Sequence, residues 1–353
     1  AYDAVLSIQG RLFLDAGRNR DALALSVQSM PRQRELIRSI IRGLPERQAL
    51  AYLSEFAPAQ DLVFSILVDQ PDLRGFAEDA WGELARSRAL VLDEMCLRQR
   101  DLSGDAEADT ARRSLARELA GLTREMAWSL VSGPEEDPRG LVRQRFLDLQ
   151  VRKEQLEHRL ADGRTSAQPD VGPAGLSPRE MARQLPPGSA LVSYLRYRHV
   201  RPFTVATGRA TTAGQTPGPT PGATPDPAPG STLGPTSGPP SDVSSYLALV
   251  MTPGGGEPVI RGLGPADDIE LRVARWQDEA GFGATVPGRA AGEADRLYRE
   301  AGRRLREAVW DPIAGLLAGA THVFIVPDGE LFLVDFATLP LGDDRVLVDE
   351  AFD

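Results

Sequence analysis

Apolar residues recur every three or four positions through roughly the first 160 residues, which is the spacing of amphipathic helices. One stripe consists of Ala111, Leu115, Leu119, Leu122, Met126 and Leu130. A second stripe consists of Val142, Phe146, Leu149, Leu156 and Leu160. Between them, "SGPEEDPRG" carries the Gly, Pro and acidic residues that end one helix and begin the next. The pattern therefore predicts two long helices in this part of the chain.

The residues before these stripes predict further helices of different lengths. A long helix begins near Phe76 and carries Trp81, Leu84, Leu90, Val91 and Met95. Shorter helices are predicted at about 1–16, 32–43, 46–56 and 58–68, joined by brief turns with Pro or Gly. Short paired helices are typical of the end of a helical-repeat array. We find no internal repetition here, so we expect the repeats themselves to lie upstream.

The period of the apolar residues changes after about residue 185. Strands are predicted at 188–199, 244–251, 257–264 and 321–326. Helices are predicted near 266–281 and 291–318, and Ser177 with Pro178 marks a capped helix start before the first strand. A strand that follows a long helix in this order predicts an α/β sheet with crossover connections. The expected fold class is thus an all-α region followed by an α/β half.

The stretch "THVFIVPDGELFLVDFATLPLG" (321–342) contains two apolar runs around a Pro-Asp-Gly turn. It predicts a central strand, a turn served by Asp328 and a following strand. The residues expected to be buried are Phe324, Ile325, Leu331, Leu333 and Phe336. We interpret this stretch as packing rather than chemistry.

Residues 207–241 are dominated by Thr, Pro and Gly and predict a disordered insertion in a hairpin loop. Long loop insertions cost little free energy, so the two flanking strands can still pair. We accordingly divide the chain into three parts. Residues 1–75 are the helical end of a tetratricopeptide-like array. Residues 76–184 are long connecting helices. Residues 185–353 are an α/β unit with the insertion.

Composition narrows the functional classes. The net charge of −10 argues against a nucleic-acid-binding surface, which needs clustered Lys and Arg. No apolar run reaches the roughly 18–20 residues that cross a bilayer, and no signal peptide is evident, so we expect no membrane contact and a cytoplasmic location. The chain begins without Met, and we expect both ends to be cut from a longer protein. Arg greatly outnumbers Lys, which indicates a GC-rich genome and weakens any argument from a single Arg.

Four residues could carry acid–base or thiol chemistry. His158 lies among charges on a predicted helix, and we interpret it as solvated. His199 ends one predicted strand and His322 begins another, and neither accompanies a nucleophile motif. Cys96 is the single cysteine, which excludes an intramolecular disulfide. Its mid-helix position beside an apolar stripe predicts a small buried hydrophobic side chain.

Two other features resemble ligand sites only superficially. "PGGGEP" (253–258) lacks the Lys-Ser/Thr ending and following helix of a phosphate loop, so we interpret it as a hairpin turn. The acidic pairs Asp267–Asp268 and Asp343–Asp344 fall at a helix start and in a turn, where acidic residues are favoured. We therefore assign no catalytic, cofactor-binding or metal-binding residue within this chain.

The second half resembles a known family. The segments 185–197, 246–276, 297–341 and 345–353 are similar, in order, to the N-terminal part of a CHAT domain. That domain is the caspase-like cysteine peptidase module found with tetratricopeptide repeats. The string "WDPI … IVPDGEL … FATLP" is the most specific part of the resemblance. The helices upstream are similar to those that link such repeats to the CHAT core.

The resemblance implies a partial caspase-like α/β sandwich. In this family a His-Cys dyad lies at the ends of adjacent parallel strands, and both residues come after the strand that here reads "RVLVDE". The chain ends at Asp353, before either could occur, so no residue here takes a catalytic role. The implied intact protein is a bacterial cysteine endopeptidase without cofactors, activated when its helical repeats bind a protein partner.

Two alternatives remain open. The chain could belong to a non-catalytic scaffold that binds proteins through its helices and a pseudo-peptidase fold. It could also be a stand-alone helical adaptor with an unrelated α/β cap.

Overall fold

The computed structural model describes residues 2–55, 58–88, 90–104, 110–131, 141–162, 177–202, 242–252, 256–342 and 345–348. The predicted disordered insertion at 207–241 and the Asp343–Asp344 pair lie outside these described residues.

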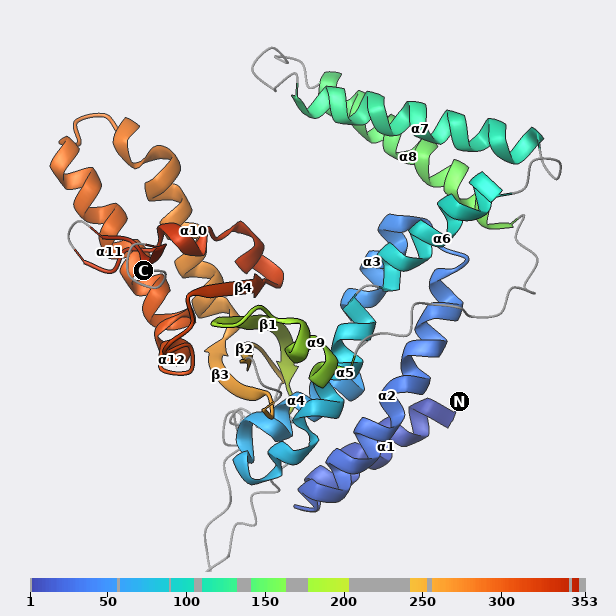
Figure 1. The fold of residues 1–353 in the computed structure, drawn as a ribbon. Helices are drawn as coiled ribbons and strands as arrows, with labels where there is room; N and C mark the ends of the chain where they lie inside the picture. Colours follow the sequence, from blue (N-terminus) through green and yellow to red (C-terminus); the bar gives the residue numbers. More distant parts are fainter. Residues whose placement is uncertain are drawn as a thin grey trace, which may run out of the picture.

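Ten helical segments precede the first strand in the described part of the chain (Figure 1). They are α1 (Tyr2–Asp15), α2 (Asn19–Ile41), α3 (Glu46–Glu55), α4 (Pro58–Asp69), the 3₁₀ helix η1 (Pro71–Phe76), α5 (Ala77–Arg88), α6 (Leu90–Gly104), α7 (Thr110–Val131), α8 (Leu141–Asp162) and α9 (Pro178–Gln184). The helices predicted at 46–56 and 58–68 are confirmed, as is the capping box of Ser177 and Glu180. None of the described helices is both long and apolar enough to span a bilayer.

Helix α2 corrects the prediction that a helix begins only at residue 32. The helix runs from Asn19 to Ile41 and continues through Pro31. A proline inside a helix removes one hydrogen bond and usually ends or kinks it. Here the buried residues Leu23 and Met30 pack in one core and Ile41 in another, so tertiary packing on both sides of Pro31 holds the helix together.

Within the described ranges, four strands form one mixed sheet in the order β3-β2-β1-β4. Their bounds are β1 (Ser189–His199), β2 (Val243–Met251), β3 (Val259–Pro265) and β4 (His322–Val326). Strand β2 is antiparallel to both β1 and β3, whereas β4 is parallel to β1. The predicted hairpin pairing of β1 with β2 is therefore confirmed. The helical half and the α/β half both occur, as expected.

Helices cover both faces of the sheet. On one face, Val192 and Tyr194 of β1 pack against α10 (Ala266–Phe282), α11 (Ala291–Val309) and α12 (Asp311–Ala314), in a core that also contains Trp276 and Leu305. The Tyr194 hydroxyl donates to the carbonyl of Val309 over 3.0 Å, which satisfies a buried polar group.

On the opposite face, Leu195 and Tyr197 of β1 share a core with α1, α2, α4 and α5. This core includes Phe64 and Leu67 of α4, which lies directly over the strands (Figure 1). Residues of a strand alternate between its two faces, so β1 takes part in both cores. The N-terminal helices are thus packed onto the sheet as one of its covering layers.

Helices α7 and α8 form a hairpin that projects away from the sheet (Figure 1). Their small shared core contains the buried residues Leu122, Leu149 and Leu156. The hairpin is attached where Glu157 of α8 accepts a hydrogen bond of 2.9 Å from the backbone N–H of Glu46, at the start of α3. A carboxylate at a helix N-terminus satisfies a free N–H and interacts favourably with the helix dipole.

The segment after β4 contradicts the predicted second strand. It forms two short 3₁₀ helices, η4 (Gly329–Leu333) and η5 (Phe336–Thr338). Asp328 and Asp335 each accept a hydrogen bond from a backbone N–H one or two residues ahead, and such local bonds favour turns over strands.

The position of β4 also differs from the prediction. Strand β4 lies at the edge of the described sheet and not at its centre. Phe324 and Leu333, predicted to be buried, are 47% and 52% exposed, whereas Leu331 and Phe336 are buried as expected. Apolar runs alone did not distinguish a strand buried on both faces from one that packs on a single face.

We predict that Gly302→Ala destabilises the protein although alanine is the better helix former. A Cβ at this position of α11 would lie 2.5 Å from the Cδ of Pro340 and 3.0 Å from the indole nitrogen of Trp276. Overpacking of this kind costs about 1–3 kcal/mol in the free energy of unfolding, measured in urea. The control is Gly281→Ala in α10, where a Cβ meets nothing and about 0.5–1 kcal/mol of stabilisation is expected. Equal effects of the two changes would contradict this account.

Candidate functional site

The second half of β1 has a strand neighbour on only one side among the described residues. Strand β2 pairs with β1 from Leu191 to His199, but β4 pairs with it only from Ser189 to Ser193. We call Tyr194–His199 the free half of β1. The main-chain groups of its even-numbered residues point to the side where β4 has ended, because alternate residues face alternate neighbours. Buried groups of this kind need other partners.

Side chains from four different segments supply those partners. We call the resulting set of hydrogen bonds the edge ladder. It consists of Arg88 to the carbonyl of Tyr194, Asp328 to the N–H of Arg196, Asp61 to the N–H of Arg198, Ser65 to the N–H of Val200, and Arg11 to the carbonyl of Arg201. The edge ladder therefore does for the free half what an adjacent strand does for the first half.

Asp328 occupies the point where β4 ends and the chain crosses the edge of β1. One of its carboxylate oxygens accepts from the N–H of Arg196 over 2.9 Å, and the other accepts from the N–H of Gly329 over 3.0 Å. Gly329 has a φ of +55°, and a side chain there would collide with the hydroxyl of Tyr246. The predicted Asp-Gly turn is thus present, and it also closes the sheet edge.

Arg88 connects α5 to both parallel strands. Its guanidinium donates to the Ser193 hydroxyl over 2.9 Å and to the Tyr194 carbonyl, and it lies 3.3 Å from the Asp328 carboxylate. Burial lowers the pKa of Arg88, and the neighbouring Asp328 charge opposes that shift. An arginine remains protonated under these conditions. The charged side chain therefore ties the helical layer to the carboxyl end of β4.

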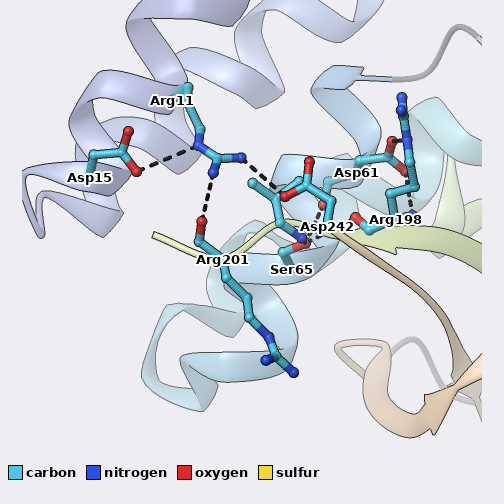
Figure 2. A network of polar contacts seen from close by, with 8 residues as sticks. Arg11, Asp15, Asp61, Ser65, Arg198, Arg201 and Asp242 are labelled. Atoms are coloured by element: carbon cyan, nitrogen blue, oxygen red, sulfur yellow. Dashed lines mark hydrogen bonds and ion pairs between the residues drawn. The ribbon is translucent and has the colours of Figure 1, made fainter. Parts of the chain in front are cut away.

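Helices α4 and α1 complete the edge ladder, as Figure 2 shows. Asp61 accepts from the main-chain N–H and the Nε of Arg198 over 3.0 and 3.1 Å. The Ser65 hydroxyl accepts from the N–H of Val200 over 2.8 Å. Farther along, Arg11 donates to the carbonyl of Arg201 over 2.7 Å and lies 3.4 Å from Asp242. Arg11 thus holds together the end of one chain segment at residue 201 and the start of another at residue 242.

A groove with a volume of about 670 Å³ opens beside the free half of β1. Its walls come from α2, α4, α5, β1 and the turn at 328–329. Four arginines line it, together with two aspartates. They are Arg34, Arg88, Arg196, Arg198, Asp61 and Asp328. We take this groove as the candidate functional site, because it lies beyond the carboxyl end of β4, where open α/β sheets bind their ligands.

The structure does not bring the four sequence candidates together. His158 is exposed on α8, and His199 contacts Asp69 over 3.0 Å. His322 is exposed at the start of β4, beside the Thr321 hydroxyl. None of the three histidines lines the groove.

The prediction that Cys96 is buried is wrong, because its side chain is exposed. Helix α6 turns Leu90, Val91 and Glu94 inward, and a residue two positions after Glu94 points to the opposite side of a helix.

The remaining candidates have structural positions. Asp267 and Asp268 occupy the first turn of α10, as predicted. The Gly-rich stretch at 253–258 connects the antiparallel strands β2 and β3, although residues 253–255 lie outside the described part. Among the described side chains, no three His, Cys, Asp or Glu residues are grouped as metal ligands. The groove offers hydrogen-bond donors and acceptors for binding.

The fold and the groove define a helical region docked onto a mixed α/β sheet. No protein-family model, no curated protein and no solved structure matches this chain.

We predict that Arg88→Ala lowers the free energy of unfolding by about 2–4 kcal/mol, because it leaves the Tyr194 carbonyl without its donor and the Asp328 carboxylate without its neighbouring positive charge. Arg303→Ala is the matched control. Arg303 forms an exposed pair with Glu307 one helical turn away, and about 0.5 kcal/mol or less is expected. Urea unfolding of both variants measures the difference, and similar losses would refute the role given to Arg88.

We predict a pH-dependent effect of Asp61→Asn. Burial is the main reason that the pKa of the Asp61 carboxyl lies above its ordinary value of 3.8, and the hydrogen bonds from Arg198 only partly oppose it. A carboxyl with a raised folded-state pKa contributes stability that is complete below pH 3.8 and is lost as pH rises through the folded pKa. The asparagine variant should therefore gain stability relative to the parent as pH rises from acid to neutral. A constant or falling difference in urea unfolding would show that the sign is wrong.

Proposed function

We propose that this chain is the helical control region and the first part of the catalytic core of a caspase-like cysteine peptidase of the CHAT class. The observation that carries the proposal is the parallel pairing of β4 with β1, at the edge of the described sheet, with the carboxyl end of β4 bonded to the helical layer. In the family that the sequence resembles, the His-Cys dyad lies at the carboxyl ends of adjacent parallel strands.

The outer edge of β4 is suited to take another strand. In a parallel ladder Val323 and Ile325 direct their main-chain groups away from β1. The strand contains no Lys, Glu or Pro, the residues that usually protect an edge from pairing. Phe324 and Val326 remain exposed on the sheet face where α4 covers the other strands. These features support the addition of further strands of a peptidase core at β4.

The edge ladder supports control by the helical region. A protein partner that shifts α5 would move Arg88, and with it Asp328 at the end of β4. Strands added beside β4 would have their carboxyl ends next to that aspartate. The helical layer could in this way alter the geometry of a site that it does not touch directly.

A second candidate function is a non-catalytic scaffold that binds proteins. The groove supports it, because side chains from several described segments line it and offer hydrogen-bond donors and acceptors. The two candidates differ in whether the natural reading frame carries the dyad.

The test uses the protein encoded by the full natural reading frame. The peptidase proposal expects a His-Gly after one strand beyond residue 353 and a Cys after the next. It also expects that this Cys, and not Cys96, reacts with a peptidyl acyloxymethyl ketone. Cys96→Ser should leave the labelling intact, whereas alanine at the downstream His should lower it at least about tenfold, the loss typical of a missing general base. A reading frame without the dyad, or labelling that disappears with Cys96→Ser, would favour the scaffold.

A further inference from the structure

At Arg196, in the centre of the free half of β1, one main-chain group has a hydrogen-bond partner and the other has none in the described part of the chain. Its N–H donates to the Asp328 carboxylate, while its carbonyl accepts no hydrogen bond from any described residue. In antiparallel pairing, one residue exchanges both an N–H and a C=O bond with the residue opposite. Arg196 could complete such an exchange after losing a single contact, that with Asp328.

The groove provides the room and the walls for an added segment. Its volume of about 670 Å³ falls within the usual range of ligand sites, roughly 300–1,000 Å³. The largely buried residues Met30, Ile37 and Leu84 form its apolar floor on the helical side. Alternate side chains of an extended peptide point in opposite directions, so one set would face these residues.

Two arginines of the groove leave terminal nitrogens open to an acidic occupant. Four arginines and two aspartates line the groove, and Glu83 and Glu270 lie beside two of these arginines. Arg34, Arg196 and Arg198 each direct the Nε toward a carboxylate of the protein, at 3.3, 2.7 and 3.1 Å. The terminal nitrogens of Arg196 and Arg198 make no hydrogen bond within the described residues. They are available for a carboxylate.

We propose that an extended peptide with acidic side chains binds this groove by adding to the free half of β1 as a strand. A peptide carbonyl replaces the Asp328 carboxylate at the N–H of Arg196, and the adjacent peptide N–H donates to the Arg196 carbonyl. Asp328 keeps its contacts with Arg88 and Gly329. An acidic side chain of the peptide meets the guanidinium groups. Main-chain pairing gives affinity and the arginines give selectivity, as in other cases of strand addition.

The first experiment selects random dodecapeptides displayed on phage against the full 353-residue chain. Selected peptides, synthesised with a fluorescein label, are then measured by fluorescence anisotropy. We expect them to be rich in Asp and Glu, and Arg34→Gln to raise Kd about tenfold. Arg261→Gln is the control, since Arg261 is exposed on β3 at the opposite side of the sheet and should change Kd less than twofold. Failure to enrich any acidic peptide would overturn the proposal.

The second experiment tests the main-chain bond itself. Arg196→Ala removes the guanidinium but keeps the N–H, whereas Arg196→Pro removes both. The N–H of Arg196 points away from β2, so the proline costs no bond of the β1–β2 pairing. We expect the proline variant to bind about tenfold more weakly than the alanine variant. Equal binding would show that the peptide is held by side chains alone.

Hydrogen exchange on the parent protein decides the question if the proline variant does not fold. Strand addition should slow exchange in the segment 194–198 when the selected peptide is bound. Unchanged exchange in this segment would overturn the proposal.

Discussion

The architecture depends on one requirement, which is that the main-chain groups of β1 beyond Ser193 must find hydrogen-bond partners without a second neighbouring strand. An unpaired buried N–H or C=O costs about 1–3 kcal/mol. Along this edge the bond at Val200 is buried, and those at Tyr194 and Arg198 are half-buried. The protein satisfies most of these main-chain groups with Arg88, Asp328, Asp61, Ser65 and Arg11, which come from α5, the turn after β4, α4 and α1, and among the described residues it leaves the Arg196 carbonyl open. The bonds of Arg88, Asp61, Ser65 and Arg11 each require a helix at a fixed position along the strand. The edge ladder therefore sets the register between the helical layer and the sheet.

The apolar core has a different role. Side chains from α1, α2, α4 and α5 pack with those of β1, β2 and β3, and this burial supplies most of the attraction between the layers. Burial is not directional, so it would tolerate small shifts of one layer over the other. The bonds from Arg88 to the Tyr194 carbonyl and from the Arg198 N–H to Asp61 join the two layers and do not tolerate such shifts. Attraction and alignment are therefore carried by different residues, and a change in alignment need not separate the layers.

Local pattern revealed most elements but few of the contacts between them. Periodicity of 3.6 or 2 residues located α3, α4, α7, α8 and β1 to β3, because each is amphipathic or strongly apolar. It missed the first half of α2, where Pro31 resembles a turn, and it extended a strand through 330–336, where aspartates cap 3₁₀ turns. The sequence pattern did not reveal the edge ladder, because its partners lie up to 190 residues apart and arginine is abundant throughout this chain. Asp328 was found only as a turn residue, since a turn is local and its bond to Arg196 is not.

The α7–α8 hairpin is attached to α3 near one of its ends. Helix α8 has 22 residues and is about 33 Å long at 1.5 Å per residue, and it is fixed near one end through Lys153, Glu157 and the start of α3. Helix α3 packs with α2, whose Arg34 and Ile37 line the groove beside β1. The α7–α8 hairpin is thus connected through α3 to the helical wall of the groove.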